Sequence, residues 1–214
     1  MLFRSQGEVP VLNIELTDVA AGTRLWDGQF RLLPGEMLGV QQEIVSVVAQ
    51  GLNRVPDGGE IAVEKPPTTN AEAYDLYIQG RYYWNKRTNL DILRSAELFQ
   101  AAIDKDPTFA KAYIGLADAY ALGNFTTIGI PTEKRTALAK SYVRKALEID
   151  DTLGEGYAAI AIGQCYSEWD FAAAEQNYRR AIDLSPNNAT AHHWYAEFLS
   201  MQARFSEKIG RAHV

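Results

Sequence analysis

The feature that most constrains this chain is a helical segment that has near-copies on both sides of it. Over residues 109–122 an aromatic residue, Tyr113, is followed by Leu116, a small residue at Ala117 and another aromatic at Tyr120. The spacing i, i+3, i+4, i+7 is typical of an amphipathic helix. Near-copies at similar intervals indicate stacked units that bury a continuous core between them.

From Ala71 onward the spacing predicts pairs of helices. We expect first helices at residues 71–86, 109–122, 153–166 and 188–202. We expect second helices at about 90–104, 133–149 and 171–183, with a fragment from Phe205. Asp106-Pro107 and Ser185-Pro186 end helices, because proline lacks an N–H donor and disfavours the helical conformation of the residue before it.

Aligning the helix pairs shows which positions repeat. Each first helix carries a small residue that lets the two helices of one hairpin approach closely, and large residues one turn away fill the space between neighbouring repeats. The matched positions are Leu76, Gly80, Tyr83, Phe99, Ala102 and Pro107; then Tyr113, Leu116, Ala117, Tyr120, Ala139, Val143, Ala146 and Asp151; then Tyr157, Ile160, Ala161, Ala174, Tyr178, Ala181 and Pro186; then His192, Tyr195, Ala196 and Leu199.

This pattern resembles the tetratricopeptide repeat, whose period is about 34 residues. The resemblance covers residues 71–207, and departs from the family where about ten extra residues surround 123–131, where Asp151 replaces proline and where Gln164 replaces tyrosine. It implies a mainly α fold, an α-solenoid of about three and a half helical hairpins. The repeats would span 71–108, 109–152, 153–187 and a truncated 188–208.

Residues 1–55 predict a different, α/β unit. Leu12, Ile14 and Leu16 alternate with polar residues, the period of a half-buried strand, and 24–30 suggests a returning strand. Apolar residues at helical spacing from Glu36 predict a helix to about Asn53. Proline and glycine over 56–70 predict a linker, and Asn70 or Thr69 is the expected N-cap of the next helix.

This first unit resembles the end of a TolB-like amino-terminal α/β domain. The resemblance rests on Glu15-Leu16-Thr17-Asp18, on Gly22-Thr23-Arg24-Leu25-Trp26 and on Gln42-Glu43-Ile44 before an apolar helix. Such domains precede tetratricopeptide repeats in bacterial regulators, behind a winged-helix, kinase or cyclase head. The resemblance therefore implies a fragment of a larger signalling protein, and no function of those heads carries over to a residue here.

The last six residues, 209–214, break the helical pattern abruptly. They can be encoded by a string that resembles a short-read sequencing adapter followed by a stop codon. We therefore expect them to be an assembly artefact and exclude them from the fold.

Charge and composition restrict the partners. Lys plus Arg is 21 against 27 for Asp plus Glu, a formal charge of −6, which argues against nucleic acid and gives no reason to expect an anionic membrane surface. No apolar run reaches the roughly 18 residues of a spanning helix. One cysteine, Cys165, excludes an internal disulfide. The compartment stays open: cytoplasm, or periplasm if the full-length protein has an upstream transmembrane helix.

We expect no catalytic, cofactor or metal site. His192 and His193 are adjacent, so on a helix they point about 100° apart and rarely share a metal. Glu168, Asp170 and Glu175 are acids near a tryptophan, but on a helical surface such residues are usually solvated. We therefore predict that the chain is not an enzyme.

The protein-binding residues are predicted from the first helices, which in this repeat family line a concave groove. An aromatic cluster in the first of them is either inter-repeat core or an anchor for a ligand; it contains Tyr74, Tyr77, Tyr82, Tyr83 and Trp84. The positions expected to face a partner are Tyr77, Arg81, Trp84, Ile114, Asp118, Ala121, Ala158, Ile162, His193 and Glu197.

Two functions remain open. The first is a non-catalytic scaffold that binds a peptide or helix in the groove. The second is the ligand-sensing region of a signalling enzyme or transcription regulator, which binds a small molecule or nucleotide between the N-terminal unit and the repeats. We also expect self-association through the truncated last repeat, with Trp194, Phe198 and Phe205 exposed.

Overall fold

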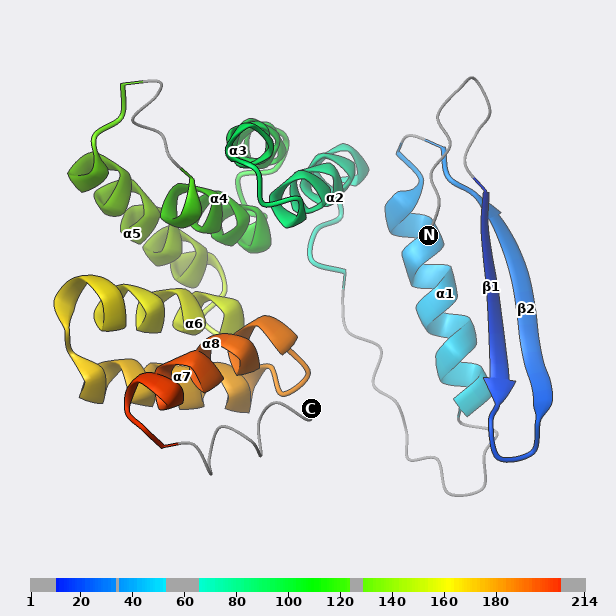
Figure 1. Ribbon diagram of the computed structural model, residues 1–214. Helices are drawn as coiled ribbons and strands as arrows, with labels where there is room; N and C mark the ends of the chain where they lie inside the picture. The colour runs from blue at the N-terminus through cyan, green and yellow to red at the C-terminus, as the bar shows by residue number, and fades with distance from the viewer. Residues whose placement is uncertain (1–10, 34, 53–65, 124–128, 205–214) are drawn as a thin grey trace. The chain divides into compact units, whose positions relative to one another are not determined.

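The structure is a computed structural model that describes residues 11–33, 35–52, 66–123 and 129–204. The chain divides into two compact units, 1–75 and 76–214, and each is described by itself (Figure 1). The predicted fragment from Phe205, the last six residues and most of the predicted linker lie outside the described residues.

The first unit contains a β-hairpin and a helix, as the alternation predicted. Strands β1 (Val11–Asp18) and β2 (Thr23–Arg31) pair antiparallel, and helix α1 spans Met37–Leu52. The register places Leu12 opposite Phe30 and Leu16 opposite Trp26, so apolar side chains share one face. In the turn between the strands, the Asp18 carboxylate accepts hydrogen bonds from the backbone N–H groups of Ala20 and Ala21 at 2.9 and 3.0 Å. Gly22 takes the left-handed conformation that the turn requires.

Gly28 has a packing role in strand β2. The indole of Trp26 lies over it, and a Cβ at position 28 would come within 2.3 Å of that ring. Residues two apart on a strand share a face, which explains the contact. The glycine therefore accommodates the tryptophan.

The repeats follow the predicted helix pairs closely. The helices are α2 (Ala71–Asn85), α3 (Asn89–Lys105), α4 (Ala110–Leu122), α5 (Thr132–Ile149), α6 (Gly154–Gly163), α7 (Phe171–Leu184) and α8 (Ala189–Met201). Figure 1 shows α4 with α5, and α6 with α7, as antiparallel pairs. Asn70 caps α2, as predicted, because its side-chain oxygen accepts from Ala73 N at 3.0 Å.

One helix ends differently from the prediction. The first helix of the third repeat was expected over 153–166, but regular α-helix stops at Gly163 and a π-helical turn, η2 (Gln164–Glu168), follows. The Gln164 carbonyl accepts from Asp170 N at 3.1 Å, and Trp169 adopts a left-handed conformation. Gln164 stands where the family has tyrosine, and its side chain accepts a hydrogen bond from Asn177 at 2.9 Å.

A repeated side-chain bond fixes the entry to the first helices. The Tyr113 hydroxyl donates to the Pro107 carbonyl at 3.3 Å, and Tyr157 donates to the Asp151 carbonyl at 3.0 Å. In the fourth repeat His192 takes the same position, with Nε2 2.8 Å from the carbonyl oxygen of Pro186. This explains how histidine substitutes for the aromatic residue of the pattern.

The junction between the first two repeats is closed by Phe99, whose side chain is fully buried. Its ring lies against Gly80 on α2 and Gly115 on α4, and a Cβ at either glycine would be 2.6 Å from the ring. Gly80 was predicted as a close-approach residue; Gly115 was not. At the equivalent place between the third and fourth repeats, the buried Tyr178 stacks on Tyr195 at 5.5 Å.

The expectation that Phe198 is exposed is wrong. Phe198 is 2% exposed and packs among Phe171, Tyr178 and Tyr195. Helix α8 turns this face onto α7, and Phe205 lies outside the described residues. Within the described ranges, the helices include none long and apolar enough to cross a membrane.

Candidate functional site

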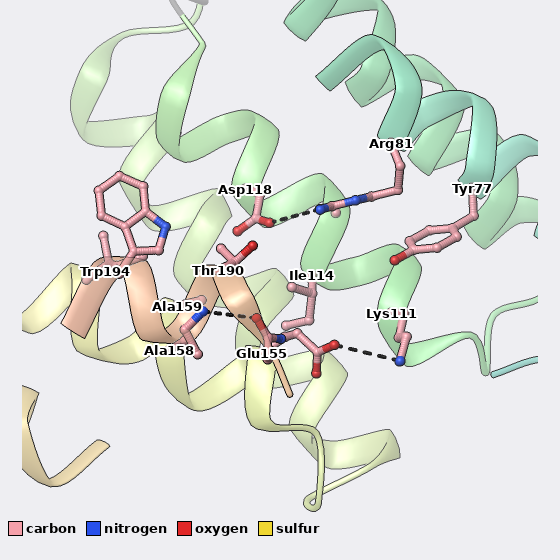
Figure 2. Close-up of a pocket in the computed structure, with 14 residues that line it drawn as sticks. Tyr77, Arg81, Lys111, Ile114, Asp118, Glu155, Ala158, Ala159, Thr190 and Trp194 are labelled. Carbon is pink, nitrogen blue, oxygen red and sulfur yellow. Dashed lines mark hydrogen bonds and ion pairs between the residues drawn. The ribbon is translucent and has the colours of Figure 1, made fainter. Parts of the chain in front are cut away.

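The first helices α2, α4, α6 and α8 together line a groove of about 180 Å³ (Figure 2). Ile114 and Ala158 form an apolar part of its wall, and Trp194 closes one end. Tyr77 and Thr190 contribute hydroxyl groups from α2 and α8. Because one helix of each repeat contributes, only the stacking of all four repeats assembles this surface.

Two ion pairs connect successive first helices along the groove. Arg81 on α2 lies 3.6 Å from Asp118 on α4, and Lys111 on α4 lies 3.7 Å from Glu155 on α6 (Figure 2). The four side chains are 22–35% exposed, so they are screened less than surface pairs. The two cations of the groove are thus already neutralised, and no free Lys/Asn clamp for a peptide carboxylate is formed by the residues described.

Among the residues that line the groove, Asp118 has the largest shift in pKa. Burial raises its pKa from 3.8 to about 6, and the guanidinium groups of Arg81 and Arg87 offset only part of that rise. The same burial lowers the pKa of Arg87. Since a buried carboxylate is easier to protonate, Asp118 is a group through which pH can alter the groove.

Six of the ten predicted partner-facing residues line the groove; they are Tyr77, Arg81, Ile114, Asp118, Ala158 and Ile162. Trp84 and Ala121 instead line a second pocket, described below. His193 is exposed, and neither it nor Glu197 lines either pocket. Their role in binding stays a prediction.

The sequence prediction missed groove residues that lie one turn nearer the start of each first helix. These residues are Lys111, Glu155, Asn188, Thr190, Ala191 and Trp194, together with Gly115 and Ala159. A helical residue recurs on the same face at i+3, i+4 and i+7, so Lys111 could have been found four residues before Gly115 and seven before Asp118. Trp194 was placed with the exposed end of the last repeat instead.

The aromatic residues of α2 do not all have the same role, inter-repeat core or ligand anchor. Trp84 is 3% exposed, and the guanidinium of Arg87 lies 3.6 Å and that of Arg81 4.5 Å from its ring centroid. Tyr82, by contrast, is 53% exposed, with the ammonium of Lys86 4.6 Å from its ring. Trp84 therefore acts as core, and Tyr77 is the member that reaches the groove.

A larger pocket, here called the inter-repeat pocket, lies between the second and third repeats. It measures about 880 Å³ and is lined by α4, α5, α6 and η2 together with Trp84 and Trp194. Its walls are mainly alanine, valine, leucine and isoleucine side chains, including Ala139, Val143 and Ile160. Nothing in the sequence pattern indicated this pocket.

The three acids singled out in the sequence have separate structural roles. Glu168 pairs with Lys140 at 2.6 Å, and Asp170 caps α7 by accepting from Ala173 N at 3.0 Å. Glu175 lies 2.7 Å from both Arg179 and Arg204. Hydrogen bonds lower the pKa of Glu175 to about 2, and the bond from Arg204 has the largest effect. These acids are therefore partnered, not simply solvated as expected.

Among the described residues, no group of three or more His, Cys, Asp or Glu side chains is placed to hold a metal ion. His192 is buried against Pro186, whereas His193 is exposed. The two histidines therefore have different surroundings.

Comparison with solved structures shows the fold. The chain superposes on a thermophilic tetratricopeptide-repeat protein of Thermus thermophilus with a TM-score of 0.54, at 14% identity, covering 83% of this chain and 86% of that one. The first tetratricopeptide-repeat domain of Spaghetti (RPAP3), bound to an HSP90 peptide, matches with a TM-score of 0.43, at 18% identity, over 61% of this chain and 93% of that one. The superposition on the Thermus thermophilus protein shows that the helical repeats have the tetratricopeptide-repeat fold.

Sequence comparison adds one relative. The chain is 33% identical over 84 residues to the type IV pilus assembly protein PilF of Pseudomonas aeruginosa. The match covers 39% of this chain and only 33% of that protein's length. No family model matches the chain. None of these three proteins is named as an enzyme, and the TolB-like resemblance of the first unit remains a prediction.

Proposed function

We propose that this chain is a non-catalytic scaffold whose first helices bind a peptide or a helix of a partner protein. The observation that carries this proposal is the groove shared by α2, α4, α6 and α8. It combines an aromatic anchor, Trp194, with apolar wall residues and polar groups at its edges. Interfaces of this composition concentrate binding energy in buried aromatic and arginine residues.

The ion pairs of the groove favour a particular kind of partner. Arg81 and Lys111 already have carboxylate partners, so an acidic peptide would have to compete with Asp118 and Glu155. Breaking a half-buried pair leaves a charge without compensation, which is unfavourable. The best-matched partner therefore places an uncharged, apolar side chain beside Ile114 and Trp194 and makes hydrogen bonds at the groove edges.

The wider context is part of the same proposal. A TolB-like unit before the repeats, as the sequence resemblance implies, would make the chain part of a larger bacterial regulatory protein. In that setting the groove would recruit another component of the signalling system. The alternative, a ligand-sensing region, is favoured by a separate observation, the apolar inter-repeat pocket, and is taken up in the next subsection.

Peptide phage display on the 214-residue chain tests the scaffold proposal. Selected peptides are re-measured against Thr190→Arg, which introduces a long charged side chain at an exposed position of the groove. We expect the dissociation constant to rise about tenfold or more, as for loss of a central contact.

Asn187→Arg is the matched control, because Asn187 is exposed and does not line the groove. It should leave peptide affinity within about twofold. Equal weakening by both variants would indicate a general effect of charge. If neither variant weakens any selected peptide, the groove is not the binding site and the proposal fails.

A further inference from the structure

A small residue stands at a repeated position in the wall of the inter-repeat pocket. Phe99, Val143 and Tyr178 each precede the residue that closes their repeat by eight positions, so they are equivalent. Phe99 and Tyr178 are fully buried and fill their junctions with an aromatic ring. Val143 is also buried, at 6% exposed, but it carries only two methyl groups at that place, and it lines the pocket.

The helices around the pocket approach closely at one end only. Near that end the Leu147 side chain lies against Gly156, where an added Cβ would be 2.7 Å from its Cδ2 atom. At the other end an ion pair of 2.6 Å between Lys140 on α5 and Glu168 in η2 spans the two sides of the pocket. The space between these two contacts is about 880 Å³, within the range of about 300–1,000 Å³ for small-molecule sites.

The pocket is lined by three acids and three cations, which differ in their partners. Each lining acid has a cationic partner: Asp118 with Arg81, Glu148 with Lys145, and Glu168 with Lys140. Arg135 donates to the carbonyls of Ala121 and Gly123 at 3.0 and 2.8 Å, so its charge is not neutralised by a carboxylate.

Arg144 also lines the pocket, is exposed, and has no carboxylate partner in the described part of the chain. The indole N–H of Trp84, a third lining group, is buried without an acceptor among the same residues. The pocket therefore combines apolar walls with an arginine that has no carboxylate partner among the described residues, and with an unmet hydrogen-bond donor.

We infer that the inter-repeat pocket binds a small amphipathic carboxylate, with the apolar body of the ligand against Val143 and Ile160 and its carboxylate at Arg144. The apolar body gains free energy by leaving water, in proportion to the area it buries. The carboxylate gains a charge-assisted, bidentate partner of the kind that arginine provides. This site is separate from the peptide proposal, although four residues line both pockets: Asp118, Ala159, Ile162 and Trp194.

Titration calorimetry of the 214-residue chain with decanoate tests the inference. Decanoate should bind with one-to-one stoichiometry and a negative heat-capacity change, the mark of apolar burial. Acetate carries the same head group without the apolar body and should give no measurable heat of binding. Decan-1-ol carries the body without the charge and should bind more weakly than decanoate.

Two variants separate the head-group and body contributions. Arg144→Gln should weaken decanoate about fivefold and leave decan-1-ol unchanged, because only the carboxylate uses the guanidinium. Val143→Phe should weaken binding of both, because a ring at this position takes up part of the pocket beside the apolar body of the ligand. Lys134→Gln removes a cation from the same helix at an exposed position outside the pocket, and should change nothing.

Helical content and melting temperature, measured for each variant, exclude unfolding as the cause. Decanoate binding that neither Val143→Phe nor Arg144→Gln weakens would be non-specific and would overturn the inference. The same conclusion follows if decanoate does not bind below its micelle-forming concentration. If only Thr190→Arg weakens binding, the acid occupies the peptide groove and the inter-repeat pocket is not its site.

Discussion

The junction between α3 and α4 is filled by an aromatic ring, whereas the corresponding junction between α5 and α6 leaves a pocket. Phe99 fills the first and is wholly buried between two glycines. Val143 holds the same place in the second, beside a pocket of about 880 Å³. The comparison links the size of one side chain per repeat to whether neighbouring repeats share a closed core or enclose a site.

The largest effect is expected for Phe99→Val, which converts the closed junction into a copy of the open one. Removing the ring from between Gly80 and Gly115 leaves a cavity, because helices packed this closely can collapse only in part. We expect the free energy of unfolding to fall by about 2–4 kcal/mol, measured by urea denaturation. A loss below about 1 kcal/mol would mean that the junction closes around valine, and that the side chain does not set its width.

A second closed junction, between α7 and α8, depends on Glu175. Its carboxylate accepts from Arg204 and from the Tyr195 hydroxyl, and its pKa is lowered to about 2. A lowered carboxyl pKa contributes stability above about pH 4.5 that is lost as the pH falls toward 2. Glu175→Gln should therefore destabilise by about 1–2 kcal/mol at pH 7 and by nearly nothing at pH 2.

Thermal melts from about pH 2 to pH 7 measure this difference. Asp183→Asn, an exposed change on the same helix, should stay within about 0.5 kcal/mol of the parent chain. A Glu175→Gln deficit that does not change with pH would show that the residue acts by packing and not by charge.

Gly115→Ala and Gly163→Ala compare a glycine whose added Cβ would meet a packed ring with one whose added Cβ would meet no atom within 4 Å. Alanine favours a helix by up to about 1 kcal/mol, but its Cβ at this position would meet the Phe99 ring at 2.6 Å. We expect a net destabilisation of about 1–2 kcal/mol in urea denaturation. Gly163→Ala, where no atom lies within 4 Å of the added Cβ, should be neutral or slightly stabilising. Equal effects at both sites would mean that the ring moves aside freely.

The reciprocal change, Val143→Phe, should act in the opposite direction from Phe99→Val. Val143 is 6% exposed but lines the pocket, so a ring that extends into the pocket would bury further apolar area, and unfolding should become about 1 kcal/mol less favourable. Valine and phenylalanine have similar helix propensities, so the backbone contributes little to the difference. Destabilisation by more than about 1 kcal/mol in urea would show that the pocket cannot accept a ring.

The smallest effect concerns Asp118, which lines the open junction and has a raised pKa of about 6. The folded chain holds this proton more tightly than the unfolded chain, so the contribution of Asp118 to stability decreases as the pH rises from about 4 to 6. Asp118→Asn removes this dependence of the free energy of unfolding on pH. Relative to the parent, the variant should gain about 1 kcal/mol between pH 4 and pH 7 in thermal melts. A constant difference would contradict the raised pKa.

Most of the helix pairs could be predicted because their signals are local. Apolar spacing, the prolines after Asp106 and Ser185, and the cap at Asn70 act within a few residues of where they stand. The hairpin in the first unit followed from alternation in the same way. The π-helical end of α6 was missed; there Gln164 accepts a hydrogen bond from Asn177 of the next helix, a contact that local spacing does not indicate.

The candidate site was only half predictable. Repeat positions placed Tyr77, Arg81 and Asp118 on the helix face that lines the groove. They did not indicate that Arg81 pairs with Asp118, or that Lys111 pairs with Glu155, because each pair joins two repeats. Trp84 was expected beside a partner, but two arginines cover it in the folded chain.

The sequence by itself determined the repeat, its helix pairs and the small and large positions that alternate along it, since these depend on periodicity and on near neighbours. Only the tertiary structure decided which junction stays open. Valine at position 143 is an ordinary helix residue, and its consequence depends on the distance between α5 and α6, which packing along the whole stack sets. The groove and the inter-repeat pocket both lie between repeats, where no single segment of sequence carries the information.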